Sequence, residues 1–137
     1  MKDYSRSLVH YETALQIAEK SFPFEDPFVA IIYSNMGKIY YRMKDYSRAL
    51  SYYQKTIESG QKAIPSDYIS IDESYYAIAK TLYHLQRYKE AIEYAKQTYH
   101  IRRNILGSQH PNVIEIKEYI HQIKKKKLEL TSNPITS

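Results

Sequence analysis

Apolar residues recur at helical spacing along most of the chain. In one stretch they stand at i, i+3, i+4, i+7 and i+11, and so share one helix face: Tyr46, Ala49, Leu50, Tyr53 and Ile57. The stretch before it has the same periodicity: Val29, Ile32, Tyr33, Met36, Ile39, Tyr40 and Met43. Only a short polar turn separates the two stretches. The pattern therefore predicts a hairpin of two amphipathic helices.

A segment of this hairpin returns along the chain. The sequence Lys-Asp-Tyr-Ser-Arg-Ser-Leu at 2–8 comes back as Lys-Asp-Tyr-Ser-Arg-Ala-Leu at 44–50, and in altered form at 86–92. Tyr4, Tyr46 and Tyr88 are spaced 42 residues apart. The windows 2–15 and 44–57 agree at seven of 14 positions, where ordinary residue frequencies give about one. Internal repetition at this period predicts stacked helical repeats.

The breaks between helices fall in register with the period. Residues that end or begin helices occupy them, namely Pro23 and Pro27, Pro65, Gly107 and Pro111. We expect helices over 3–21, 27–43, 46–63, 69–85, 88–105 and 111–130. The predicted fold is all-α, a right-handed solenoid of antiparallel helical hairpins. It comprises the second helix of a partial repeat (3–21), complete repeats at 27–63 and 69–105, a capping helix at 111–130 and a disordered tail at 131–137.

Small residues recur in phase with the 42-residue period. They are Gly37 and its period mate Ala79 in the first helices, and Ala49, Ala91 and Ser7 in the second. The segment Leu-Gly-Ser-Gln-His-Pro-Asn-Val at 106–113 has a shorter echo at 26–29. Both features resemble tetratricopeptide repeats, in the long variant of kinesin light chains, and the resemblance implies that these small residues stand where the paired helices cross. The chain departs from that pattern at Tyr68-Ile69, where His-Pro is usual, and at Ala95, where a large aromatic is usual.

The two ends of the array differ. In the last helix the small-residue position holds His121, and Lys117 and Lys124 occupy two usual core positions. We therefore expect a solvent-facing cap of the kind that a solenoid needs at its end. The helix at 3–21 lacks a first helix before it and is expected to expose some of Leu8, Tyr11 and Leu15. This suggests the tail of a longer array, or self-association through helix 3–21.

The composition bears on where in the cell the protein works. The chain has 137 residues, no cysteine and a net charge of +5. Without cysteine there is no disulfide framework and no thiolate metal site, which favours a reducing, cytoplasmic location. No segment approaches the roughly 20 apolar residues of a membrane span. The basic excess gathers near the run Lys124–Lys127, which we interpret as a solvated helix end rather than a patch for nucleic acid or lipid.

The sequence offers little for catalysis. His110 lies in the linker motif, where histidine caps and packs, and the other four histidines are scattered. The three glycines are isolated, so no loop can cradle a phosphate. We therefore expect no enzyme activity, no cofactor and no metal in this chain.

A strip on the inner side of the first helices is the candidate binding site. Its members in the first complete repeat are Ser34, Asn35, Lys38, Tyr41 and Arg42, and in the second Tyr76, Lys80, Tyr83 and His84. The resemblance implies that Asn35 grips peptide backbone, whereas its mate Ala77 lacks the amide. Cations and rings together favour an extended acidic or aromatic peptide on a concave face. In the alternative interpretation, Tyr41 and Tyr83 only pack and both lysines are solvated.

Three functional hypotheses follow. The leading one is a protein interaction scaffold that binds a peptide on its concave face. The second is an accessory repeat tail of a larger enzyme whose catalytic domain lies outside this chain. The third is a nucleic-acid-binding helical repeat, whose affinity would fall steeply with salt; the sparse cations of the strip do not favour it.

Overall fold

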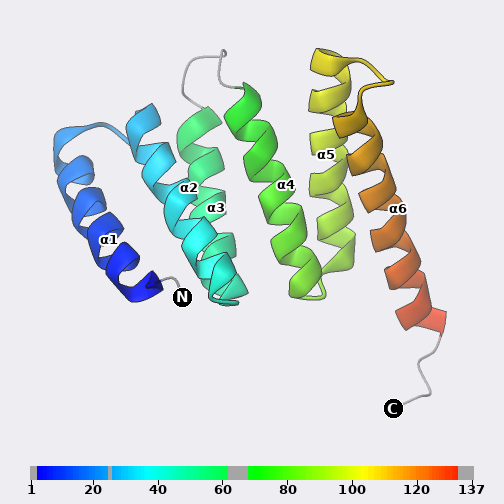
Figure 1. Ribbon diagram of the computed structural model, residues 1–137, viewed down its shortest axis with the longest axis horizontal. Coiled ribbons are helices and arrows are strands. Elements are labelled where there is room, and N and C mark those ends of the chain that lie inside the picture. Colours follow the sequence, from blue (N-terminus) through cyan, green and yellow to red (C-terminus); the bar gives the residue numbers. More distant parts are fainter. Residues whose placement is uncertain (1–2, 25, 62–67, 133–137) are drawn as a thin grey trace. The chain divides into compact units, whose positions relative to one another are not determined.

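The computed structural model describes residues 3–24, 26–61 and 68–132, and within them it contains α-helices and no strands (Figure 1). The helices are α1 (Tyr4–Ser21), α2 (Pro27–Arg42), α3 (Tyr46–Gln61), α4 (Tyr68–His84), α5 (Tyr88–Leu106) and α6 (Pro111–Ser132). The all-α prediction with about six helices is confirmed. The predicted turn at Pro65 lies outside the described residues.

The last helix is longer than expected. α6 continues to Ser132, whereas the sequence suggested an end at 130 and a disordered tail from 131. The Thr131 hydroxyl donates to the carbonyl oxygens of Lys127, at 3.0 Å, and Leu128, at 3.1 Å. Such bonds from a threonine hydroxyl to carbonyls one turn earlier are common within helices, and they accompany helical backbone at 131. Residues 133–137 of the predicted tail lie outside the described part of the chain.

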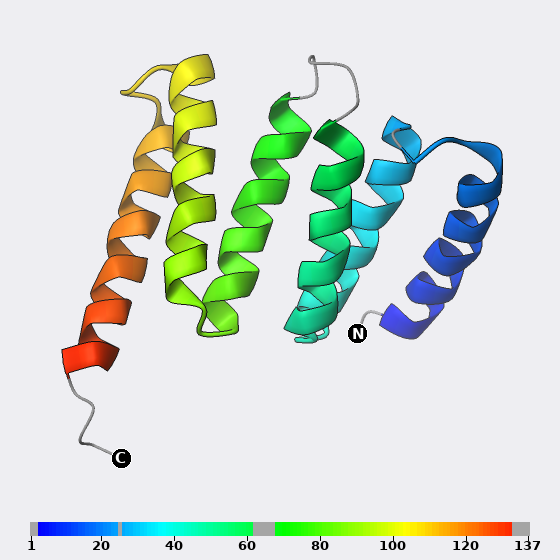
Figure 2. The same ribbon diagram turned by 180° about the vertical axis from the view of Figure 1, so that it is seen from behind.

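The chain divides into two compact units, residues 1–74 and 75–137, with the boundary inside α4. In the first unit, α1, α2 and α3 lie side by side and successive helices run in opposite directions (Figures 1 and 2). In the second unit the same is true of α4 from Tyr75 onward, α5 and α6. Each unit is thus built from antiparallel neighbours joined by short connections.

The first unit has a core between α1 and α2. Its buried members are Ala18, Val29, Ile32, Tyr33 and Met36. Tyr11 and Leu15 pack half-buried against this cluster, and Leu8 is half-buried as well. The sequence suggested that α1 would expose some of these three, and the structure leaves part of each in solvent. Val9 and Ile17 are the strongly exposed apolar residues of α1, at 63% and 61%, because they lie on the face away from α2.

The crossing of α2 and α3 depends on a glycine. A Cβ atom on Gly37 would lie 2.8 Å from two ring carbons of Tyr53, and that ring is 3% exposed. Real Cβ atoms do not come so close to a ring. In the second unit the period mates are Ala79 and Ala95, both fully buried. The first hairpin pairs Gly37 with Tyr53, and the second has alanine at both corresponding positions. The small Ala95 on α5 therefore goes with a residue on α4 that is one methyl group larger than glycine.

The second unit buries its own apolar residues. They include Ile78, Leu82, Ile92, Val113, Ile116 and Ile123. At the start of α6, His110 Nδ1 accepts the backbone N–H of Asn112 at 3.1 Å, which gives this imidazole a structural role. Lys117, His121 and Lys124 of α6 are exposed. The buried stripe of α6 therefore runs along the face that holds Val113, Ile116 and Ile123.

Both hairpin turns use the same backbone conformation. Lys44 after α2 and Gln86 after α4 have φ angles of 63° and 61°. Asp45 N–H donates to the carbonyl of Tyr40 at 2.9 Å, and Arg87 N–H donates to that of Leu82 at 2.9 Å. The N–H of Lys44 also donates to the carbonyl of Tyr41, and that of Gln86 to the carbonyl of Tyr83, both at 3.0 Å. This pair of bonds is the Schellman ending of a helix, which usually places glycine at the left-handed position.

We expect Lys44→Gly and Gln86→Gly each to stabilise the protein by about 0.5–1 kcal/mol, because glycine adopts a positive φ without steric cost. Chemical denaturation followed by circular dichroism measures the change. Gln54→Gly, at an exposed interior position of α3, is the matched control and should lose about 1 kcal/mol. A loss at Lys44 equal to that at Gln54 would contradict the prediction.

Candidate functional site

The predicted strip of the first unit lies on α2 with its cations outward. Ser34 and Asn35 are half-buried, whereas Lys38 and Arg42 are exposed. Tyr41 is half-buried and its ring makes an edge contact with Tyr46, at 5.4 Å between centroids. Tyr41 therefore packs against α3 of the same hairpin, while the charged groups of Lys38 and Arg42 are exposed to solvent.

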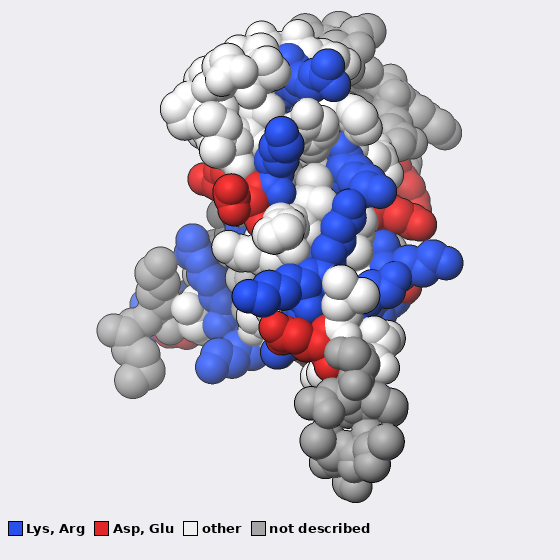
Figure 3. Space-filling model, turned by 90° about the vertical axis from the view of Figure 1, so that its right-hand side faces the viewer, with Lys and Arg blue, Asp and Glu red and all other residues white. Residues whose placement is uncertain are grey.

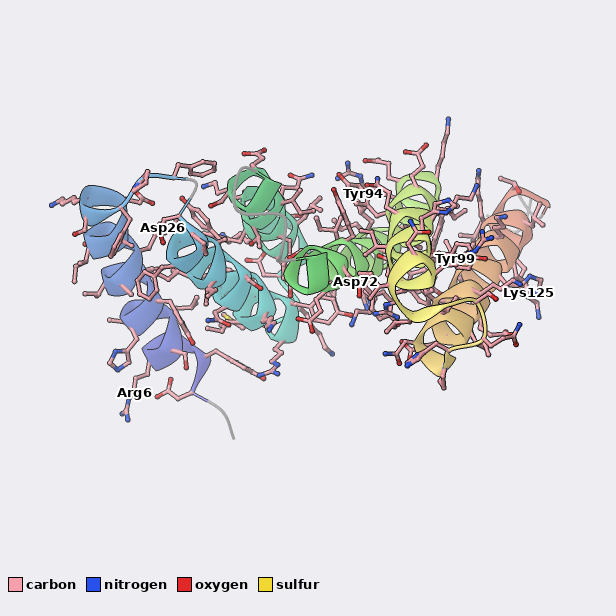
Figure 4. All side chains as sticks on the ribbon, turned by 90° about the horizontal axis from the view of Figure 1, so that it is seen from above. Arg6, Asp26, Asp72, Tyr94, Tyr99 and Lys125 are labelled. Atoms are coloured by element: carbon pink, nitrogen blue, oxygen red, sulfur yellow. The ribbon has the colours of Figure 1, made fainter. Side chains whose placement is uncertain are left out.

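A cavity adjoins this strip between α1 and α2. Its volume is about 340 Å³ and its lining residues are Asp3, Tyr4, Arg6, Ser7, His10, Ile39 and Arg42. Figure 4 shows Arg6 projecting from the beginning of α1. Arg6 Nε lies 3.6 Å from the Asp3 carboxylate, and both side chains are largely exposed. The cavity is thus lined by one arginine from each helix, Arg42 on α2 and Arg6 on α1.

The strip of the second unit is more enclosed. Tyr76, Lys80 and Tyr83 on α4 are half-buried, and His84 is exposed. Lys80 Nζ lies 4.5 Å from the centroid of the Tyr76 ring, within the range of a cation–π interaction. In this unit the structure brings a predicted lysine and a predicted tyrosine together. Lys80 is thus not the simple solvated lysine of the alternative interpretation.

A second cation completes this cluster. Arg102 on α5 places its Cζ atom 4.9 Å from the centroid of the Tyr76 ring, although its side chain is only 11% exposed. Its Nη1 donates to the carbonyl oxygen of Asn112 at 3.0 Å and lies 3.5 Å from Glu115 Oε1 on α6. Arg102 therefore connects α5 to α6 while it contacts the predicted strip.

Burial is the main cause of the pKa shifts of Tyr76 and Lys80. Burial raises the pKa of Tyr76, and the Glu115 carboxylate raises it further, while Arg102 acts in the opposite direction. Burial also lowers the pKa of the Lys80 ammonium; nearby Glu115 opposes this effect and nearby Arg102 adds to it. The ring of Tyr76 is thus kept neutral between two cations of an enclosed surface.

Rings from three helices continue the cluster. Tyr83 lies 5.4 Å from Tyr88, 6.0 Å from His84 and 6.2 Å from Tyr119, measured between centroids. Tyr119 of α6 also meets Tyr76 edge-on at 5.6 Å. Tyr83 therefore packs, as the alternative interpretation expected, but its contacts join it to the same aromatic cluster as Tyr76.

The sequence did not indicate three members of this cluster: Arg102, Glu115 and Tyr119. A signal existed for Tyr119, which stands 42 residues after Ala77 and 84 after Asn35 and therefore occupies the strip position of the last first-type helix. Arg102 had no such signal, because its period mate is Gly60. Its role depends on where α5 meets α6, which the spacing along one helix does not reveal.

Other kinds of site were sought in the described residues. No group of three or more histidine and acidic side chains there lies close enough to hold a metal ion. Within the same ranges, no helix is both long and apolar enough to span a bilayer.

Comparisons with known proteins agree with this architecture. Models of the tetratricopeptide repeat match residues 1–62 and 73–112. Two crystal structures of a candidate kinesin light chain of Podosopora anserina, with nearly identical TPR-like repeats, superpose with TM-scores of 0.76 and 0.75. Both are 17% identical to this chain and are matched over 94% of it. The chain spans 62% and 63% of their lengths. A search of curated proteins finds no match.

The two repeat matches together cover most of the chain, and the solved structures share its fold of long helical hairpins. Repeats of this family generally serve as scaffolds for protein interactions and are typically not catalytic. The chain belongs to the tetratricopeptide repeat family, with a fold like that of kinesin light chain repeats.

Proposed function

We propose that the chain binds an extended acidic or aromatic peptide through the inner side chains of its first helices. The observation that carries this proposal is the placement of Lys80 and Arg102 at 4.5 Å and 4.9 Å from the Tyr76 ring. Positive charge next to a neutral ring suits a peptide that carries carboxylates and apolar or aromatic side chains. In the first unit, exposed Lys38 and Arg42 and the half-buried amide of Asn35 supply the corresponding groups.

Partial burial supports a peptide-binding role over a purely structural one. Tyr53 is 3% exposed and has no ring surface to offer a ligand, whereas Tyr41, Tyr76 and Tyr83 keep part of their surface in solvent. Half-exposed tyrosines offer a rigid apolar face together with a polar edge, which makes the residue common in interfaces. Their contacts with neighbouring helices hold the rings in place for a ligand at low entropic cost.

Charge reversal tests the proposal. We expect Lys38→Glu with Lys80→Glu to weaken the binding of a labelled acidic peptide library by at least about tenfold, because each change replaces attraction by repulsion. Fluorescence anisotropy measures the affinity. Lys89→Glu with Lys96→Glu, two exposed lysines of α5, is the control of equal charge. Unchanged affinity in the first pair would reject the strip as the site.

The alternative of an accessory tail of an enzyme concerns residues outside this chain. It is compatible with peptide binding, since a repeat array can deliver a substrate protein to a linked catalytic domain. Activity assays of a longer protein that contains these repeats, with and without the Lys38 and Lys80 changes, separate the two roles. Loss of turnover on a protein substrate with retained turnover on a small substrate would favour the accessory role.

A further inference from the structure

In the first complete hairpin, the first helix presents a defined set of positions to the second. Tyr33 and Tyr40 of α2 contact the ring of Tyr52 on α3, at 6.3 Å and 5.4 Å between centroids. Between them, Gly37 lies against Tyr53. Positions 33, 37 and 40 therefore form the helix-contact face of α2.

The second hairpin uses the same face. Position 75 is the period mate of 33, and Tyr75 of α4 lies 5.9 Å from Tyr94 of α5. The mates of 37 and 40 are Ala79 and Leu82, which are 0% and 1% exposed. Two hairpins of the same chain thus agree on which face of a first helix receives a second helix.

In α6 the mates of these positions are polar and exposed. They are Lys117, His121 and Lys124. Helical spacing adds Ile114, Lys125 and Leu128 to the same stripe, and Ile114 and Leu128 are 47% and 67% exposed. Figure 3 views the molecule from the α6 side and shows Lys and Arg side chains gathered there, and Figure 4 shows Lys125 projecting outward. We call these six residues the α6 stripe.

The basic excess of the protein belongs to this unit. Residues 75–137 contain 11 Lys and Arg against five Asp and Glu, a net charge of +6, whereas residues 1–74 contain nine against ten, a net charge of −1. A cap that only needs water could carry either sign of charge or neutral polar groups. The α6 stripe contains three lysines, one histidine and no carboxylate.

We propose that the α6 stripe binds an amphipathic helix of a partner protein that carries acidic residues, in the place that the second helix takes in the two complete hairpins. Lysine ammonium groups at 117 and 124 pair with carboxylates spaced one to two turns apart on the partner. Ile114 and Leu128 at the two ends of the stripe receive apolar side chains. Uncharged or basic helices are excluded, because they would leave the lysines without counter-charges.

This surface shares with the strip proposed to bind extended peptides only Lys125, the period mate of Tyr41 and Tyr83, and it does not depend on that function. A basic helix with exposed leucine and isoleucine also has the composition of a membrane-surface helix. A partner helix is favoured over a membrane because the period mates of Lys117 and Lys124 on α2 and on α4 face a second helix. Binding to acidic lipid is therefore an outcome that the experiment must separate.

The test uses the full 137-residue chain and a labelled 19-residue peptide with the α5 sequence, in which Ala91→Glu and Tyr94→Glu place two carboxylates on the face that packs against α4. The control peptide has lysine at both positions. We expect the glutamate peptide to bind at least about tenfold more tightly than the lysine peptide at low salt. Fluorescence anisotropy gives the affinities.

Charge reversal on the protein then identifies the surface. Lys117→Glu with Lys124→Glu should weaken glutamate-peptide binding about tenfold and reverse the preference toward the lysine peptide, whereas Lys89→Glu with Lys96→Glu should leave both unchanged. Lys117→Gln with Lys124→Gln should give an intermediate loss, and circular dichroism verifies folding of each variant. Equal losses in both glutamate pairs, absence of peptide binding, or binding only to vesicles of phosphatidylserine would each overturn the proposal.

Discussion

Replacing Gly37 by alanine is expected to destabilise the protein by about 1–2 kcal/mol, although the same change in an exposed helix would stabilise it by about 1 kcal/mol. The new methyl group would stand 2.8 Å from two ring carbons of Tyr53. That ring is buried between helices and cannot swing into solvent. Either the ring or the helix axis must move, and both movements disturb the packing of α2 on α3. Urea denaturation of the variant and the parent measures the difference.

A double-mutant cycle isolates the contact. Tyr53→Ala alone should cost about 3–5 kcal/mol through the cavity that it leaves. The pair Gly37→Ala with Tyr53→Ala reproduces the Ala79 and Ala95 combination of the next hairpin, so it should cost less than the sum of the single changes by at least about 1 kcal/mol. Ala79→Gly is the control and should lose about 2 kcal/mol, from helix propensity and from the buried methyl group that it removes. Additive single effects would contradict the close crossing.

Arg102→Ala is expected to destabilise the protein by about 2 kcal/mol, because it removes a hydrogen bond from a charged group, worth about 1.5–3 kcal/mol, together with the packing of a largely buried side chain. The change removes the bond to Asn112, the ion pair with Glu115 and the packing of the guanidinium stem on Tyr76. Glu115 is 58% exposed, so solvent screens the ion pair and its share is small. Thermal unfolding with calorimetry measures the total.

The neighbouring arginine provides the control for this prediction. Arg103 is exposed on the same turn of α5, so Arg103→Ala should change stability by less than about 0.5 kcal/mol. If peptides bind next to Tyr76, Arg102→Ala should also weaken acidic-peptide binding more than Arg103→Ala does. Equal stability of the two variants would show that the contacts of Arg102 do not hold α5 to α6.

The helices and their turns were predictable because their causes are local. Apolar spacing marks the buried face, and a 42-residue repeat fixes the boundaries of each copy from the others. Gly107 and Pro111 mark the break before the last helix. Lys44 and Gln86 were not recognised as left-handed positions, since neither is glycine or asparagine. Their conformation is imposed by the hydrogen bonds of the helix ending rather than by the side chain.

The candidate site was predictable only in part. Spacing along α4 put Tyr76, Lys80 and Tyr83 on one helix face, because residues three, four and seven apart share a face, and in the structure Lys80 lies over the Tyr76 ring. It did not reveal that Lys80 is half-buried or that Arg102 approaches the same ring from α5. Burial of a charged side chain depends on what the neighbouring helices place around it. That information is absent from the periodicity of any single helix.

By itself, the sequence determined the repeat and the number and approximate extent of the helices, which follow from apolar spacing within about 42 positions. The resemblance to tetratricopeptide repeats placed Gly37 at the first crossing. Only the tertiary structure decided that Tyr53 fills the space above Gly37, that Val9 and Ile17 rather than Leu8 are exposed on α1, and that Arg102 joins Tyr76 to Glu115. The physical reason is that contacts between helices depend on their distance and rotation, which side-chain volumes from several helices set together.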